Sequence, residues 1–217
     1  MGKFSNAMAG MGKVRTNNHP NAHKAKVQIR RNVMAAIGTV RVFDAFAGDG
    51  GMWRGVWCEA RHYVGCDLEW YRDARLAYVA DNRRVLRAID LREFNVIDLD
   101  AYGSPWEQAL IVADRRPVSP GEKIGILLTE GSGLKLKMGG FPGALRMLAG
   151  IRAGAVGGGT GASRAELNDR AIAGLAKRMN CNILHRWEAH GKTGTHMAYI
   201  GLVFEGKKIA PASEGEG

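Results

Sequence analysis

Two short stretches of this sequence combine glycine, acidic and aromatic residues in spacings that suit the binding of a ligand. Residues 44–50 read Asp-Ala-Phe-Ala-Gly-Asp-Gly, and residues 95–105 contain Asp98, Asp100 and Tyr102. Glycines let a ligand approach the backbone closely because they have no Cβ. A carboxylate beside an aromatic ring can hold a planar amine, since the carboxylate accepts its N–H groups and the ring stacks on it. We therefore expect a ligand cradle at the first stretch and an amine-presenting site at the second.

The glycine-rich stretch lies where a strand is expected to pass into a helix. Residues 41–46 form a short apolar run typical of a strand, and residues 52–60 favour a helix. Residues 62–67 form a second strand that ends in Asp67. Open α/β sheets bind ligands at the carboxyl ends of their strands. Asp67, about 20 residues after the glycines, is placed to accept hydrogen bonds from two ribose hydroxyls, an arrangement that also fits a dinucleotide.

The rest of the chain continues the alternation of helices and strands. Helices are expected over residues 25–37, 71–82, 105–115, 141–153 and 167–179. Strands are expected over residues 85–90, 94–100 and 123–129, and a hairpin over residues 182–188 and 197–204. This alternation predicts an α/β protein with a parallel sheet that is covered on both faces.

Positive charge is concentrated at the N-terminus. The net charge of the 217 residues is +10, and residues 1–43 contain no Asp or Glu. The basic residues of this segment are Lys3, Lys13, Arg15, Lys24, Lys26, Arg30, Arg31 and Arg41. A basic arm attracts nucleic acid because it releases counterions from the phosphate backbone, whereas a solvated tail without a partner is the alternative. We expect a basic flexible arm over residues 1–23, one domain over residues 24–205 and a disordered tail over residues 206–217.

Several other classes of protein are not expected. No apolar run reaches the ~20 residues of a membrane helix, so a cytoplasmic protein is expected. The cysteines Cys58, Cys66 and Cys181 show no Cys-x-x-Cys spacing, and an odd count argues against a disulfide framework. The histidines lack a convincing set of partner ligands, so no metal is expected. Residues 154–161 are glycine-rich but lack the Gly-Lys-Ser/Thr of a phosphate cradle, and they favour a flexible loop.

The glycine-rich stretch resembles the Asp-x-Phe-Ala-Gly-x-Gly loop of class I methyltransferases, which use S-adenosyl-L-methionine. A dinucleotide-binding Gly-x-Gly-x-x-Gly pattern fails because Trp53 stands at its third glycine. The resemblance implies a Rossmann-like three-layer sandwich, with a mainly parallel seven-stranded sheet and an antiparallel last strand. It also implies that Asp67 binds the ribose and that Asp90, at the end of the expected strand 85–90, lies near the adenine. The expected cofactor-binding residues are Asp44, Ala45, Phe46, Gly48, Gly50, Asp67, Asp90 and Asp98.

The second stretch resembles the Asp-x-Asp-Pro-Phe-Gly-Ser-Pro segment of the tRNA guanine-N2 dimethyltransferase family. Ala101 stands where that family has proline, and the family's C-terminal domain has no counterpart in the resemblance. The resemblance implies that Asp100 accepts hydrogen bonds from an exocyclic amine and that Tyr102 stacks on its base. It favours RNA guanine over DNA adenine as the target, and the base must leave its stack to reach the methyl group.

Two other functions remain open at this point. The chain could methylate a small molecule or a protein side chain, or it could be a catalytically silent module that binds RNA through the basic arm. The tryptophans Trp53, Trp57 and Trp187 are expected in the core or at its rim, whereas Trp106, beside the second stretch, is a candidate platform for a base.

Overall fold

The computed structural model describes residues 20–131, 142–151, 163–191 and 197–208. Residues 1–19 of the expected arm, the glycine-rich loop 154–161 and residues 209–217 of the expected tail lie outside these ranges. In the described part of the chain seven strands form one sheet in the order β3-β2-β1-β4-β5-β7-β6. The strands are β1 (Arg41–Asp44), β2 (His62–Asp67), β3 (Ala77–Val79), β4 (Val96–Leu99), β5 (Lys123–Glu130), β6 (Cys181–His190) and β7 (Ala198–Gly206).

The sheet is mainly parallel, with one reversed strand near an edge. Strands β1 to β5 pair in parallel, whereas β7 is antiparallel to both β5 and β6. This arrangement confirms the expected seven-stranded sheet with an antiparallel last strand. Because β1 and β4 are neighbours, the ends of these two strands, at Asp44 and Asp98, lie side by side.

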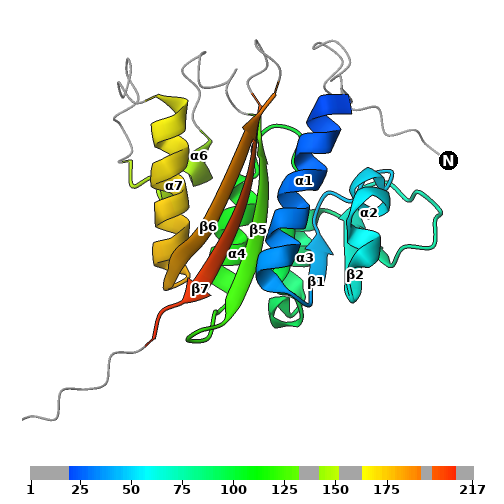
Figure 1. Ribbon diagram of the computed structural model, residues 1–217, viewed down its shortest axis with the longest axis horizontal. Helices are drawn as coiled ribbons and strands as arrows, with labels where there is room; N and C mark the ends of the chain where they lie inside the picture. Colours follow the sequence, from blue (N-terminus) through cyan, green and yellow to red (C-terminus); the bar gives the residue numbers. More distant parts are fainter. Residues whose placement is uncertain (1–19, 132–141, 152–162, 192–196, 209–217) are drawn as a thin grey trace, which may run out of the picture.

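Helices cover both faces of the sheet and make three layers (Figure 1). One face packs against α1 (Pro20–Ile37), α2 (Gly51–Gly55) and the 3-10 helix η1 (Trp57–Glu59). The other face packs against α3 (Asn82–Ala88), α4 (Trp106–Arg115), α6 (Gly143–Leu148) and α7 (Arg164–Arg178). None of the described helices is long and apolar enough to cross a membrane.

Helix α1 lies unusually close to the sheet because glycines make room for it. A Cβ on Gly125 of β5 would lie 2.5 Å from Val33, and a Cβ on Gly201 of β7 would lie 2.5 Å from Ile29. The helix begins at Pro20, which suits a first turn, and Gly38 follows its last residue with φ +86°. It therefore starts earlier than the expected residue 25.

The expected assignment of residues 71–90 is wrong. The expected helix 71–82 contains strand β3, and the expected strand 85–90 is mostly helix α3. Helix α3 forms because the Asp81 side chain caps it by accepting a hydrogen bond from Arg83 N, while Val85 and Leu86 become buried. The connection from β2 to β3 consequently contains no helix, and all three residues of β3 are exposed.

The remaining elements follow the expected ones with shifted ends. Helix α4 begins after Pro105, as expected, and strands β4 and β5 lie within or close to their expected ranges. The C-terminal hairpin is confirmed as β6 and β7. Helix α6 is shorter than the expected helix 141–153, and α7 begins three residues earlier than expected, at a capping box formed by Ser163 and Glu166.

Candidate active site

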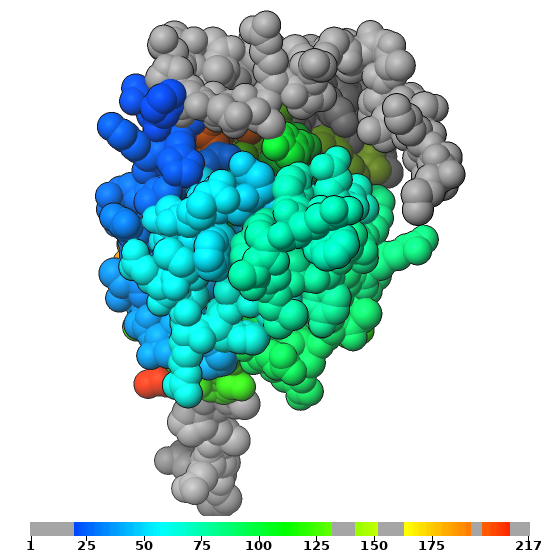
Figure 2. Space-filling model, turned by 90° about the vertical axis from the view of Figure 1, so that its right-hand side faces the viewer, coloured from blue at the N-terminus to red at the C-terminus, as the bar shows by residue number. Residues whose placement is uncertain are grey.

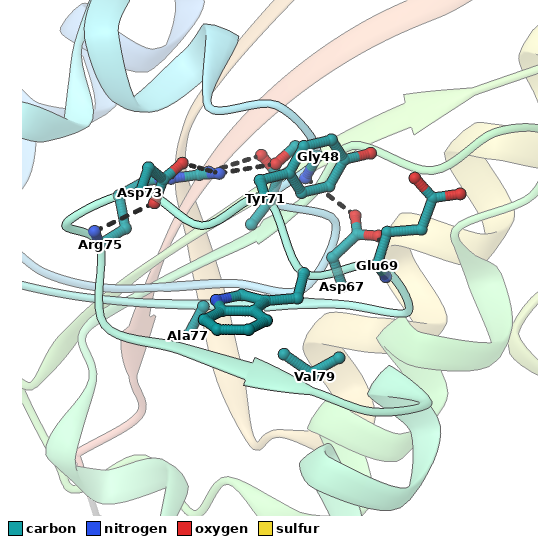
Figure 3. A pocket seen from close by; sticks show the side chains of 10 residues that line it. Gly48, Asp67, Glu69, Tyr71, Asp73, Arg75, Ala77 and Val79 are labelled. Carbon is teal, nitrogen blue, oxygen red and sulfur yellow. Dashed lines mark hydrogen bonds and ion pairs between the residues drawn. The ribbon is translucent and has the colours of Figure 1, made fainter. Parts of the chain in front are cut away.

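The loop after β1 has a backbone conformation that requires glycine. Gly48 and Gly50 have φ values of +46° and +82°, in the left-handed region that side chains disfavour. Gly48 N donates a hydrogen bond of 2.9 Å to the Asp67 carboxylate at the end of β2 (Figure 3). The loop and the expected ribose-binding acid are therefore held together, as the sequence predicted for neighbouring strand ends.

A small pocket opens beside this contact. It is lined by Ala47, Gly48, Asp67, Glu69, Trp70, Tyr71, Asp73, Arg75, Ala77 and Val79. Figure 3 shows that these residues come from the glycine loop, from the end of β2, from the β2–β3 connection and from β3 itself. The second oxygen of Asp67 accepts a hydrogen bond of 3.0 Å from Glu69 N, which fixes the carboxylate at the pocket.

Arg75 is a pocket residue that the sequence analysis missed. Its guanidinium donates to the carbonyl oxygens of Ala47 at 2.9 Å and Gly48 at 2.7 Å, and it pairs with Asp73 at 2.6 Å. A Cβ on Gly50 would lie 2.9 Å from the Arg75 guanidinium carbon. Arg75 thus links the β2–β3 connection to the glycine loop. The sequence did not indicate this contact, because residues 71–82 were expected to form a helix.

Asp44 and Ala45, the residues that lead into the glycine loop, are buried in the core. Asp44 is 1% exposed and accepts hydrogen bonds from Phe46 N at 3.2 Å and from the Tyr63 hydroxyl at 3.0 Å. Burial, together with the nearby charge of Asp98, raises the pKa of Asp44 to about 8. Ala45 is buried as well, whereas Phe46 is partly exposed. Asp44 and Ala45 therefore support the loop from the core side.

Asp98 is part of a buried ion pair. Its carboxylate accepts two hydrogen bonds from Arg30 of α1, at 2.7 and 2.8 Å, and one of 2.7 Å from the Trp57 indole. Both Asp98 and Arg30 are almost fully buried. We expected Asp98 to bind the cofactor, but its oxygens are occupied inside the protein and its side chain does not reach the pocket.

Asp100 is held by two cations of the same helix. Lys26 Nζ lies 2.6 Å from its Oδ1 and Arg30 Nη2 lies 3.4 Å from its Oδ2. Four residues of helix rise by about 6 Å and two residues of strand by about 6.6 Å, so Lys26 and Arg30 match the spacing of Asp98 and Asp100. Although burial opposes ionisation, the charges of Arg30 and Lys26 keep the pKa of Asp100 below its usual value.

Tyr102 lies at the surface, two residues after Asp100. Its side chain is 73% exposed, and the following Gly103 turns the chain with φ +102° and accepts a hydrogen bond of 2.5 Å from Gly131 N. The pKa of Tyr102 is raised by partial burial and by nearby carboxylates. These carboxylates are Asp100, Asp49 and Asp67. The charges of Asp100 after β4 and of Asp67 at the pocket therefore both act on the phenol.

Two sequence-predicted residues lie away from this site. Asp90 precedes η2 (Leu91–Glu93) and pairs with Arg92 at 2.8 Å. It comes before the start of β4 and thus lies at the end of the strands opposite to the glycine loop. The expectation that it ends a strand near an adenine is wrong. Trp106 is fully buried at the start of α4, so this candidate platform cannot offer a stacking surface.

The residues after β3 reach the loop in place of Asp90. Asn82 donates a hydrogen bond of 2.8 Å to the carbonyl oxygen of Ala45, and its amide oxygen accepts one of 3.0 Å from Gln108. The signal for this contact was the Asp-Asn pair before an apolar stretch, which is typical of a helix start. Within the described ranges no group of three or more His, Cys, Asp or Glu side chains could hold a metal ion.

Comparisons with known proteins detect the fold and little else. No family model matches this sequence, and neither does any curated protein. Trm1 from Pyrococcus horikoshii, solved with S-adenosyl-L-methionine, has a TM-score of 0.56 and 14% identity over 86% of this chain and 55% of its own. The N-methyltransferase NodS from Bradyrhizobium japonicum, solved with S-adenosyl-l-homocysteine, has a TM-score of 0.54 and 11% identity over 88% and 90%. The chain has the fold of class I methyltransferases.

A small-molecule enzyme also shares this fold. The 1,6-didemethyltoxoflavin-N1-methyltransferase of Burkholderia thailandensis has a TM-score of 0.50 and 10% identity over 87% of this chain and 80% of its own. The chain spans about half of the Pyrococcus Trm1 chain, as the 55% coverage shows. The Rossmann-like architecture is thus confirmed.

Proposed function

We propose that this chain is an S-adenosyl-L-methionine-dependent methyltransferase that acts on an exocyclic amine of a nucleic-acid base, with RNA guanine as the favoured target. The observation that carries the proposal is the order of the strands at the glycine loop. Strand β1 lies between β2 and β4, so Asp67 at the end of β2 and Asp100 after β4 flank the loop that follows β1, and an amine-presenting pair adjoins a nucleoside-binding loop. The solved Trm1 and NodS structures contain this cofactor or its demethylated product, which supports the choice of cofactor.

The residues at the pocket suit the cofactor. The position that a Cβ would take on Gly48 has no neighbour nearer than 3.9 Å, so a ligand can lie against the backbone there. Asp67 faces the pocket and is the acceptor for the ribose hydroxyls, while the loop from Phe46 to Gly50 holds the methionyl part. When bound, the cofactor supplies an electrophilic methyl group.

Asp100 and Tyr102 prepare the acceptor. The lone pair of an exocyclic amine is delocalised into its ring, so the nitrogen attacks poorly unless it is held in place. Asp100 stays ionised beside Lys26 and retains lone pairs that can accept the amine N–H. The Asp100 carboxylate would stabilise the positive charge that develops on the nitrogen as it takes up the methyl group, and the nitrogen would then release a proton to solvent. Tyr102 stacks on the base from the exposed side.

Two other targets compete with RNA guanine. DNA adenine offers the same kind of amine, and the likeness to the toxoflavin enzyme favours a small molecule as the second candidate. The N-terminal basic residues Lys3, Lys13 and Arg15 favour a nucleic acid, because a small neutral substrate gains nothing from them.

A labelled-methyl assay tests the proposal. The chain is incubated with methyl-labelled cofactor and, separately, with total tRNA, rRNA, DNA and a metabolite extract, and the labelled pool is digested to nucleosides. We expect label in RNA as N2-methylated guanosine, and no label with the Asp100→Ala variant. Label confined to the metabolite extract would contradict the nucleic-acid target, and no label in any pool would contradict the enzyme assignment.

A further inference from the structure

An apolar surface lies over β3, which no helix of the described residues covers. We call it the β3 patch and define it as Leu68, Trp70, Tyr71, Leu76, Tyr78 and Val79. These side chains are between 41% and 74% exposed. They belong to the molecular face shown in Figure 2, within the segment coloured cyan to green. Soluble proteins seldom leave several large apolar side chains together in water unless the surface binds something.

The β3 patch carries its own cation. The Arg72 guanidinium lies 5.3 Å from the centre of the Trp70 ring, in the geometry of a cation–π contact. Arg72 has a φ of +54°, which is uncommon for a residue other than glycine and is often found at binding sites. The neighbouring Asp73 is paired with Arg75, so its charge is neutralised. An indole that is 68% exposed and an arginine therefore lie side by side at the tip of the connection.

The patch is continuous with the candidate active site. Trp70 and Tyr71 line the same pocket as Gly48 and Asp67. The pKa of Tyr71 is raised by partial burial and by the charges of Asp67 and Glu69. A strand of nucleotides that leaves the pocket beside Asp67 would therefore meet Tyr71 and Trp70 next.

We propose that Trp70 and Tyr71 form a stacking platform for unpaired nucleotides next to the target base, with Arg72 placed for their phosphates. The proposal rests on the proposed function, because it needs a nucleic-acid substrate. Exposed aromatic rings and arginines are the groups that bind single strands without reading their sequence. A second copy of this chain could instead add a strand to β3, but this edge offers only three residues, a short template for pairing.

Binding of a short, unstructured, fluorescein-labelled RNA tests the platform. Anisotropy titrations are made with excess S-adenosylhomocysteine for the wild type and for Trp70→Ala, Trp70→Phe and Ile183→Ala. Ile183, 42% exposed on β6, is an apolar control outside the patch. Loss of one stacked base weakens binding roughly 5- to 150-fold, so we expect this for Trp70→Ala. Trp70→Phe should stay within about threefold of the wild type, since its ring still stacks, and Ile183→Ala should match the wild type.

The other outcomes each contradict the proposal. If Trp70→Ala binds the RNA within about twofold of the wild type while the wild type methylates RNA, the platform is wrong and the proposed function stands. If the wild type binds no RNA, both fail. If light scattering shows a wild-type dimer that Trp70→Ala converts to a monomer, the patch is an interface between copies of this chain. Because Trp70 lines the pocket, cofactor affinity is measured separately by calorimetry for every variant.

Discussion

Asp100 illustrates how a single residue depends on a partner that lies far away in the sequence. Lys26 reaches it across 74 residues of chain, and both side chains are less than 20% exposed. The sequence analysis counted Lys26 and Arg30 among the charges of a basic N-terminus. In the structure Arg30 pairs with Asp98 and Lys26 with Asp100, so neither is available to a phosphate backbone in the way an arm residue would be.

Replacing Lys26 tests whether it keeps Asp100 ionised. Lys26→Met retains most of the aliphatic stem and removes the charge that lowers the pKa of Asp100. The acid limb of the kcat profile should therefore move to higher pH, and kcat at pH 6 should fall further below its value at pH 8 than in the wild type. Lys24→Met is the matched control, because Lys24 is exposed on the same helix. Superimposable profiles for the two variants would mean that Lys26 does not act on the reacting carboxylate.

Asp44 predicts a dependence of folding stability on pH. Its pKa is about 8 in the folded chain and about 4 in an unfolded one, so the folded state holds an additional proton between these values. The Asp44 contribution to the free energy of unfolding therefore falls as pH rises from about 4 to about 8. Asp44→Asn removes this loss. Urea unfolding at several pH values should show the variant gaining stability relative to the wild type up to pH 8 and levelling off above it; a constant difference would show that Asp44 is not protonated in the folded state.

At the scale of elements, the glycine loop depends on backbone conformation. Gly50→Ala places a side chain at φ +82° and against the Arg75 guanidinium. The next residue, Gly51, begins α2, has no positive φ and makes only ordinary contact at 3.5 Å. A left-handed residue other than glycine costs about 1–2 kcal/mol. We expect Gly50→Ala to lower the melting temperature and to weaken cofactor binding, and Gly51→Ala to change both little. Equal effects in thermal melts and calorimetry would contradict the role given to Gly50.

The elements found from sequence are those with a strong apolar signal. Strands β4 and β5 are continuous buried runs, and the loop before α2 is fixed by its glycines, so their places could be predicted. The segment 71–90 could not, because β3 has three exposed residues and therefore no alternation. In α3 the neighbouring Val85 and Leu86 are buried, and a run this short looks the same in a strand and in a helix.

The site residues likewise divide into those with a local sequence signal and those without one. Gly48, Gly50, Asp67 and Asp100 follow from motifs that are local in sequence. Arg75 could not be found, because its partners are backbone carbonyls of another segment, which leave no pattern in the sequence. The predicted place of Asp90 was wrong because it depended on a strand over residues 85–90, which are mostly helix α3. Lys26 and Arg30 did leave a signal, since they share a face of α1 with the buried Ile29 and Val33.

For the whole molecule, the proposed attraction to RNA has a measurable electrostatic part. Residues 1–19 carry three basic residues and no acid. Each phosphate contact to a single strand contributes about 0.7 to the slope of log affinity against log salt, so deleting residues 1–19 should reduce the slope by up to about 2. RNA titrations from low to high salt measure it for both forms. An unchanged slope would show that these residues do not contact the nucleic acid.

The most direct test of the whole account is calorimetric titration of S-adenosylhomocysteine into the wild type, Asp67→Ala and Asp90→Ala. Charge-assisted hydrogen bonds contribute about 1.5–3 kcal/mol, so Asp67→Ala should bind the ligand roughly 10- to 150-fold more weakly. Asp90→Ala should bind like the wild type, because Asp90 lies beside Arg92 at the opposite end of the strands. No binding to the wild type, or equal affinity for all three proteins, would contradict a cofactor site at the ends of β1 and β2.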